Sequence, residues 1–294
     1  MSSMKPESPV QGGEQLTADQ ERRQEIARAA QRLEAFLQTL NPDDMARQSA
    51  CEGWTVADVV GHLVERGGPI PDQIERGLAG DLSPTPGIST EPPVSEDQFR
   101  LDLDRSAVAL RHELGDRLLE ELARQNREFD RVLSLVQPGD WEKLCYHRLR
   151  PETVRAKTDI RIAELAMHEW DIHWAFDKDA ALAEDSLPGL VSASGRAVRR
   201  AFRPDPARTR PVRYRFDLSG PAATTVDVVL APEGAGFEIA ASPQPDVVFN
   251  SSAATYAMVI FGRLKLDHAI ESGRVTTGSD AQLVSAFIAA FVGG

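Results

Sequence analysis

Residues 51–64 read CEGWTVADVVGHLV, and their pattern is the most informative one for predicting the fold. Thr55, with the acidic Asp58 three residues later, is typical of a helix start. The valines and the leucine that follow recur on one face, which indicates a helix packed against a core. His62 lies on the polar face, one turn after Asp58, so a carboxylate is placed to orient the imidazole ring. The segment therefore predicts a core helix that also presents a histidine.

Residues 161–172, RIAELAMHEWDI, place a second set of reactive side chains on another predicted helix. Glu164 and His168 are four residues apart, so they project about 40° apart on successive turns and can reach one metal ion. A third ligand has to come from elsewhere in the chain. Asp171 is placed to orient the ring of His168. A zinc-protease HExxH motif is excluded, because His173 is one position too late for its geometry.

The same residues also have a purely structural interpretation. A glutamate and a histidine at this spacing occur on many helices as a solvated pair. We expect His147 and His173 to be surface or hydrogen-bonded residues. Cys51 is a candidate nucleophile, but a cysteine of this kind is more often a small buried apolar side chain.

Hydrophobic spacing around these two segments predicts helices through the first 200 residues. The expected helices cover about 17–40, 55–66, 95–136 with an interruption at Gly115, 152–176 and 186–202. Residues 1–16 contain no such pattern, so we expect a disordered leader there.

The pattern changes near residue 203, where apolar residues begin to alternate with polar ones, as in half-buried strands. The expected strands lie near 212–218, 226–230, 237–240 and 247–249, and two helices follow near 252–263 and 283–291. We therefore predict two domains, a helical one over residues 17–203 and an α+β one over residues 207–294.

Composition narrows the class of function. The 294 residues carry 33 basic and 45 acidic side chains, and the net charge of −12 argues against nucleic acid and anionic membranes as partners. The two cysteines are too few for a disulfide framework or a cysteine-rich zinc module, so the six histidines and the carboxylates remain for metal or acid–base chemistry. Because the chain has no membrane-spanning run and its N-terminus has no signal-peptide pattern, we expect a cytoplasmic protein.

The two motif segments together resemble the mycothiol-dependent maleylpyruvate isomerase family. Residues 51–63 resemble its signature C-x-G-W-T-V-x-D-L-x-x-H-L, although Glu52 stands where a proline is common, and residues 161–172 resemble R-x-x-E-x-x-x-H-x-W-D. The resemblance implies a DinB-like four-helix bundle followed by a small sterol-carrier-like α+β domain. It also implies that His62, Glu164 and His168 bind a divalent metal ion, usually zinc.

The resemblance further implies a catalytic arginine in the C-terminal domain, for which Arg274 and Arg263 are both candidates. Asp58 and Asp171 would orient the metal-binding histidines through hydrogen bonds without binding the metal themselves. The implied function is that of an enzyme in which a metal-bound thiolate of mycothiol, a small thiol of actinobacteria, attacks a small electrophilic substrate. Such an enzyme is either a cis-trans isomerase or an S-transferase.

Two alternatives from other classes remain. One is a non-catalytic carrier that holds a lipid or another small molecule in the C-terminal domain, and the other is a regulatory binding protein. The expected partners of the enzyme are the thiol and the electrophile, in a monomer or a small homo-oligomer.

Overall fold

The computed structural model describes residues 18–87, 96–148, 150–202, 204–205, 208–239, 244–278 and 280–291. The leader expected at residues 1–16 lies outside these ranges. Among the described residues, no helix combines the length and the apolar character needed to cross a bilayer.

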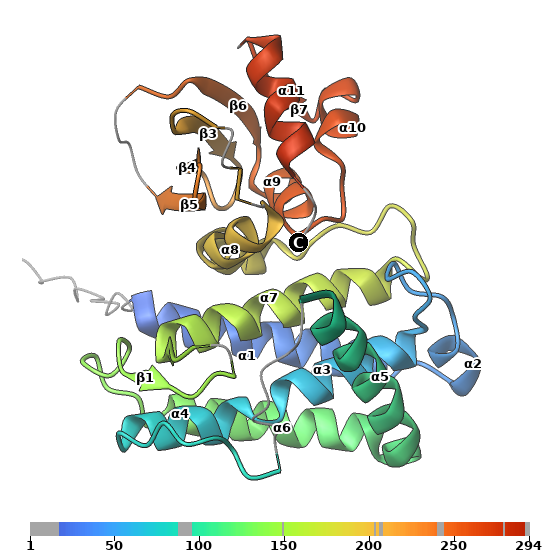
Figure 1. Ribbon diagram of the computed structural model, residues 1–294. Helices are drawn as coiled ribbons and strands as arrows, with labels where there is room; N and C mark the ends of the chain where they lie inside the picture. The colour runs from blue at the N-terminus through green and yellow to red at the C-terminus, as the bar shows by residue number, and fades with distance from the viewer. Residues whose placement is uncertain are drawn as a thin grey trace, which may run out of the picture.

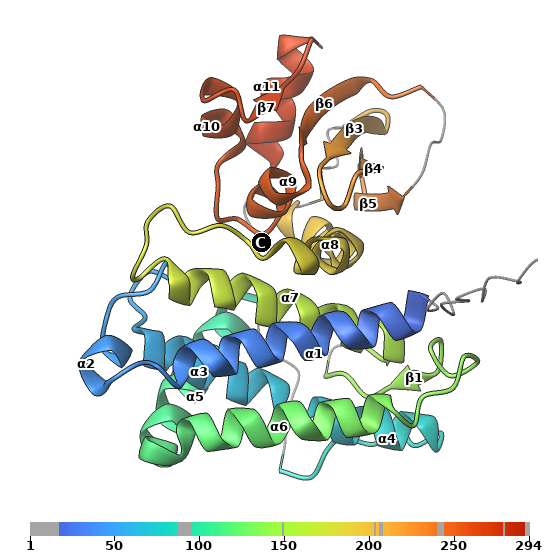
Figure 2. The same cartoon turned by 180° about the vertical axis from the view of Figure 1, so that it is seen from behind.

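The first half of the chain is helical, as predicted. Its helices are α1 (Ala18–Leu37), α2 (Pro42–Met45), α3 (Val56–Gly67), α4 (Ile70–Leu78), α5 (Glu96–Leu114), α6 (Leu118–Leu133) and α7 (Val154–His173). Helices α1, α3, α6 and α7 pack around a common apolar core, and α5 lies against α3 (Figures 1 and 2). A short hairpin of β1 (Leu144–Cys145) and β2 (Glu152–Thr153) packs against α4.

Local signals in the sequence account for where these helices begin and end. The side chain of Thr55 accepts a hydrogen bond from the backbone of Asp58, whose carboxylate in turn accepts one from the backbone of Thr55, so the predicted start of α3 is confirmed. Gly115 has a φ of 51° and begins a single 3-10 turn between α5 and α6, so the predicted interruption is also confirmed.

The second half of the chain builds a five-stranded sheet covered by helices. Its elements are α8 (Leu187–Ala201), β3 (Val212–Ser219), β4 (Thr224–Ala231), β5 (Gly234–Ile239), β6 (Val247–Ser252), α9 (Ala253–Ile260), α10 (Leu266–Glu271), β7 (Val275–Thr276) and α11 (Ala281–Ala290). The strand order is β5-β4-β3-β6-β7, and only the β3–β6 pair is parallel among the described strands.

Helix α8 lies between the sheet and the bundle and contacts both. It packs on α7 on one side and on β5 and α9 on the other (Figure 1). The alternating residues of β3, from Val212 to Leu218, are buried in the same core as α8 and α11. The predicted fold class, a helical bundle followed by a small α+β region, is confirmed, whereas the domain boundary near residues 203–207 stays a prediction.

The pattern of residues did not anticipate α2, α4, the β1–β2 hairpin, α10 or β7. Apart from α4, which has nine residues, each is six residues or shorter. A segment this short does not complete two turns or a full alternation, so tertiary contacts rather than periodicity determine its form.

Candidate metal centre

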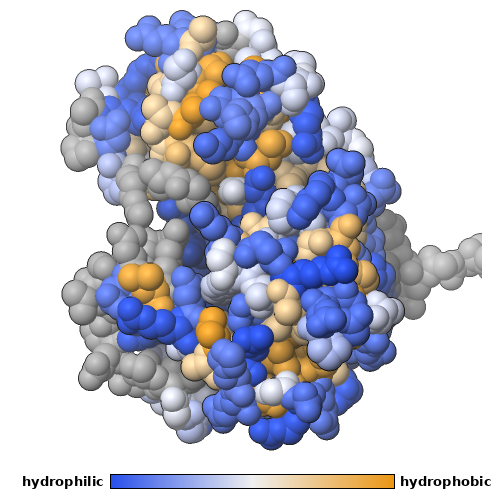
Figure 3. Space-filling model, turned by 90° about the vertical axis from the view of Figure 1, so that its right-hand side faces the viewer, coloured by the Kyte–Doolittle hydropathy of each residue, from blue (hydrophilic) through white to orange (hydrophobic). Residues whose placement is uncertain are grey.

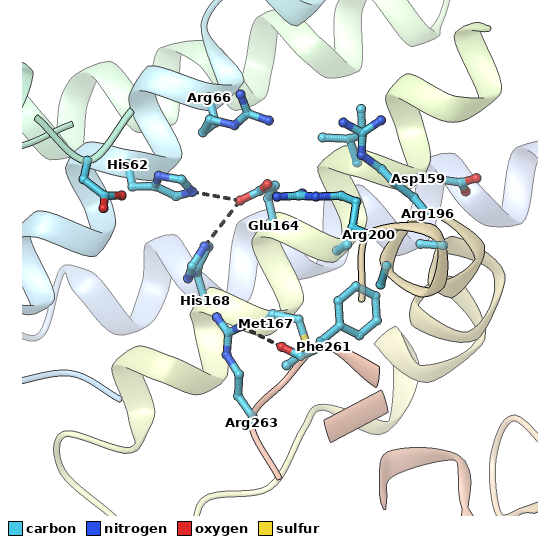
Figure 4. A pocket seen from close by; sticks show the side chains of 15 residues that line it. His62, Arg66, Asp159, Glu164, Met167, His168, Arg196, Arg200, Phe261 and Arg263 are labelled. Carbon is cyan, nitrogen blue, oxygen red and sulfur yellow. Dashed lines mark hydrogen bonds and ion pairs between the residues drawn. The ribbon is translucent and has the colours of Figure 1, made fainter. Parts of the chain in front are cut away.

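Helices α3 and α7 bring three predicted metal ligands together. His62 Nε2 lies 3.1 Å from Glu164 Oε2, and His168 Nε2 lies 3.3 Å from the same oxygen. One ligand atom of each residue lies within 4.8 Å of the other two. Figure 4 shows both imidazole rings directed at the Glu164 carboxylate. The spacing of four on α7 supplies two of these side chains, and the packing of α3 against α7 supplies the third.

The ring of His168 is held from behind by Asp171. His168 Nδ1 lies 2.8 Å from Asp171 Oδ2, which leaves Nε2 directed at the cluster. Asp171 is fully buried and also accepts two hydrogen bonds from Arg263, at 3.0 and 2.6 Å. The thiol of Cys51 donates to the same carboxylate at 3.3 Å. Asp171 therefore lies in the position expected for a carboxylate that orients a metal-binding histidine.

The protonation of these groups follows from burial and from their hydrogen bonds. Burial would raise the pKa of the Glu164 carboxyl, but hydrogen bonds with His168 and His62 outweigh it and hold that pKa well below its usual range. Burial likewise opposes the charge on His168, but hydrogen bonds with Asp171, Cys51 and Glu164 raise its pKa well above the usual value. Glu164 is therefore held as a carboxylate between the two imidazole rings.

Asp58 does not contact the ring of His62, contrary to the geometry that their spacing suggests. One carboxylate oxygen of Asp58 accepts hydrogen bonds from Thr55, and the other lies 3.6 Å from Arg111. His62 Nδ1 is buried and has no hydrogen-bond partner among the described residues. The indole of Trp54 instead lies beside the imidazole, with ring centroids 5.2 Å apart. The spacing in the sequence suggested that Asp58 orients the ring of His62. In the structure the Asp58 carboxylate instead caps the start of α3.

The cluster lies in a pocket of about 300 Å³ between the bundle and the C-terminal half. Arg263 lines this pocket, whereas Arg274 is exposed on the turn before β7 and does not. The surface is hollowed where the sheet-bearing part meets the bundle, and apolar residues form only separate groups on that face (Figure 3). Of the two candidate catalytic arginines, the pocket therefore contains Arg263 alone.

The pocket also contains arginines that sequence reasoning missed. They are Arg66 on α3 and Arg196 and Arg200 on α8. Arg66 was open to detection, because it follows His62 by four residues and so lies on the same helix face. The two residues of α8 carry no local signal, since only the packing of α8 on α7 brings them to the pocket.

The described residues fit a divalent metal ion. Two imidazole nitrogens and a carboxylate oxygen converge from two rigid helices, and Asp171 fixes the ring orientation of one imidazole. This donor set is one that catalytic zinc sites use, with the remaining coordination positions open. Cys51, His168 and Asp171 form a second group of possible ligand atoms, but it shares His168 with the first.

Comparisons with known proteins agree with this architecture. The chain resembles the solved crystal structure of the mycothiol-dependent maleylpyruvate isomerase with a TM-score of 0.56 and 15% identity, over 89% of this chain and 93% of that one. A mutant of that isomerase gives the same values. At this identity the likeness shows the fold alone. No curated protein sequence matches the chain.

The family model described as the mycothiol maleylpyruvate isomerase N-terminal domain matches residues 26–173. This match covers half of the chain and includes both motif segments and all three clustered side chains. The chain therefore belongs to the mycothiol maleylpyruvate isomerase N-terminal domain family.

Proposed function

We propose that the chain is a metal-dependent, mycothiol-dependent enzyme that acts on a small electrophilic substrate, as a cis-trans isomerase or as an S-transferase. The observation that carries the proposal is the convergence of His62, Glu164 and His168 within 4.8 Å at the wall of a pocket. Membership in a family named for a mycothiol-dependent isomerase supports the choice of thiol.

We assign zinc to the site, because two histidines and one carboxylate with open positions form a known catalytic zinc pattern. When bound, the ion would lower the pKa of a thiol and so supply a sulfur nucleophile at neutral pH. Asp171 holds the tautomer and orientation of His168, and the two α7 ligands keep their spacing through the helix backbone. The role of the chain is thus to fix the ligands and to keep the surroundings partly dry.

The electrophile in this proposal carries a double bond conjugated to a carbonyl group. One carbon of the double bond accepts the sulfur, and the displaced electron pair moves to the carbonyl oxygen. In an isomerase the pair returns after rotation and expels the sulfur, so no atom is gained or lost. In a transferase the neighbouring carbon takes up the thiol proton, and the carbon–sulfur bond remains. Arg263 lines the pocket and stays paired with Asp171, and its positive charge would lower the energy of the negative charge on the oxygen without binding it directly.

Metal analysis of the purified protein tests the site directly. We expect about one zinc ion per chain in the wild type and a loss of most of it in His168→Ala, because two ligands alone bind zinc weakly. The matched control is His112→Ala, since His112 is exposed on α5 and far from the cluster in sequence. A wild-type protein that takes up no stoichiometric metal, even after incubation with zinc, rules the proposal out.

A thiol screen tests the second half of the proposal. The zinc-loaded protein is incubated with mycothiol, glutathione or bacillithiol and a panel of conjugated electrophiles, and products are followed by mass spectrometry and by absorbance. We expect isomers or conjugates with mycothiol, and none with His168→Ala. Equal turnover by the wild type and by this variant would exclude chemistry at the metal centre.

A further inference from the structure

The arginines that line the pocket differ in whether their charge is already paired. Arg196 forms an ion pair with Glu152, Arg263 is paired with Asp171, and Arg200 has a further interaction of its own. Among the described residues, Arg66 forms neither a hydrogen bond nor an ion pair, although its charge acts on the neighbouring Glu65. Among the arginines that the structure describes in the pocket lining, Arg66 is therefore the one available to an incoming anion.

The position of Arg66 suits an anion held beside the metal centre. It follows His62 by one helical turn, and Figure 4 shows it above the Glu164 carboxylate, on the side away from Met167. A partly buried guanidinium gains from a carboxylate, which it can bind through two parallel hydrogen bonds. Asp104 and Asp159 place two further carboxylates in the lining. Asp159 is already paired with Arg22, so Asp104 is the acid that disfavours a second negative charge on the same ligand.

The pocket lining also includes a group of apolar side chains. It consists of side chains from α7, from α8 and from the segment that follows α9, namely Ile160, Ala163, Met167, Ala193, Ala197 and Phe261. Met167 and Phe261 lie below the Glu164 carboxylate in Figure 4. The three alanines leave the space that larger side chains would fill. An apolar group seated there loses contact with water and gains van der Waals contacts.

We propose that the electrophile bound here is a monocarboxylate with an apolar body, its carboxylate on Arg66 and its body against the wall formed by Met167, Phe261 and Ala197. This inference rests on the proposed function, since it names the substrate class of the same site. It assigns Arg66 to binding the anion and Ala197 to limiting the size of the body.

Calorimetric titration of the zinc-loaded protein without thiol tests this assignment. The probes are trans-cinnamate, with one carboxylate and a phenyl ring, fumarate, with two carboxylates and no apolar body, and cinnamyl alcohol, with no charge. We expect cinnamate to bind at least about tenfold more tightly than either of the others. Only cinnamate has both a carboxylate for Arg66 and an apolar ring for the apolar side chains. Fumarate binding as tightly as cinnamate, or tighter, overturns the proposal.

Two variants separate the two contacts. Arg66→Gln is expected to weaken cinnamate about tenfold or more, and Arg66→Lys to restore part of that loss. Ala197→Phe is expected to weaken cinnamate while leaving fumarate unchanged. The matched control is Arg124→Gln, which removes an exposed guanidinium on α6 and should leave all three affinities as they are. Unchanged cinnamate affinity in Arg66→Gln contradicts the role given to Arg66.

The zinc content of each variant is measured on the same samples, so the two proposals fail separately. If zinc binds stoichiometrically and cinnamate shows no preference, the substrate class is wrong and the metal centre stands. If the wild type binds no zinc, the proposed function is wrong.

Discussion

Lys157 is a buried ammonium group outside the candidate site. Its side chain is 2% exposed, donates a hydrogen bond to Gln73 at 2.8 Å, and lies 3.8 Å from a Glu152 oxygen. Burial lowers the pKa of Lys157 to about 8, because the charged form loses its hydration and the nearby carboxylate compensates only in part. The unfolded chain restores the usual value of about 10.4.

Lys157 should therefore contribute to the pH dependence of the protein's stability. Between pH 8 and about 10.4 the unfolded state binds more protons at Lys157 than the folded state does, so the free energy of unfolding rises with pH. The shift corresponds to about 3 kcal/mol. Urea denaturation at several pH values should show the wild type gaining this amount relative to Lys157→Met across that range.

The control for this experiment is Lys143→Met, because Lys143 is largely exposed and pairs with Asp140 on the surface. Its pH profile should run parallel to that of the wild type. A parallel profile for Lys157→Met as well would mean that the buried amine does not titrate as we predict.

Among the secondary-structure elements, the β1–β2 hairpin shows why part of the fold could not be predicted from the sequence. The hairpin has only two residues in each strand, and its position depends on Gly77 of α4. A Cβ at Gly77 would lie 2.5 Å from the carbonyl oxygen of Leu144 and 2.8 Å from the sulfur of Cys145. The long helices were predictable because their own repeats specify the buried face, whereas this hairpin forms through a contact between distant segments.

Gly77→Ala should push the hairpin away from α4 and destabilise the protein by about 1–3 kcal/mol, the usual cost of overpacking. A urea denaturation midpoint measures this loss. Gly139→Ala is the matched control, since a Cβ there meets nothing within 4 Å. If both variants are equally stable, the packing of α4 on β1 is looser than the structure indicates.

For the whole molecule, the ion pair between Arg263 and Asp171 joins its two halves. It ties α7 to the segment after α9, next to the candidate metal centre. The Asp171 carboxylate is fully buried and accepts a hydrogen bond from His168 as well. The same carboxylate thus orients a proposed metal ligand and holds the C-terminal half against the bundle.

Removing the Arg263 guanidinium should lower the free energy of unfolding but leave zinc binding unchanged. Arg263→Gln leaves a buried carboxylate short of its charged partner, for which we expect a loss of about 3 kcal/mol in urea denaturation. Zinc content should remain that of the wild type, because Asp171 still accepts from His168. Arg210→Gln, which breaks an exposed pair with Asp246, should cost less than about 1 kcal/mol. Equal losses in both variants would show that Arg263 does not join the two halves.

The features that depend on neighbours along the chain were predictable from the sequence alone. Helix periodicity specified the bundle helices and the alternating strand β3, capping residues specified the start of α3, and the spacing of four placed Glu164 and His168 on one face. These features follow from backbone geometry, which is the same wherever the segment lies.

Which distant side chains meet could be learned from the three-dimensional structure alone. It showed that Asp58 is used in capping and does not reach His62, that Arg263 rather than Arg274 lines the pocket, and that α8 contributes a wall to it. Such contacts depend on how helices and sheet pack against one another, and many packings are compatible with the same local pattern. The ligands on one helix could therefore be predicted from spacing, while the rest of the pocket required the fold.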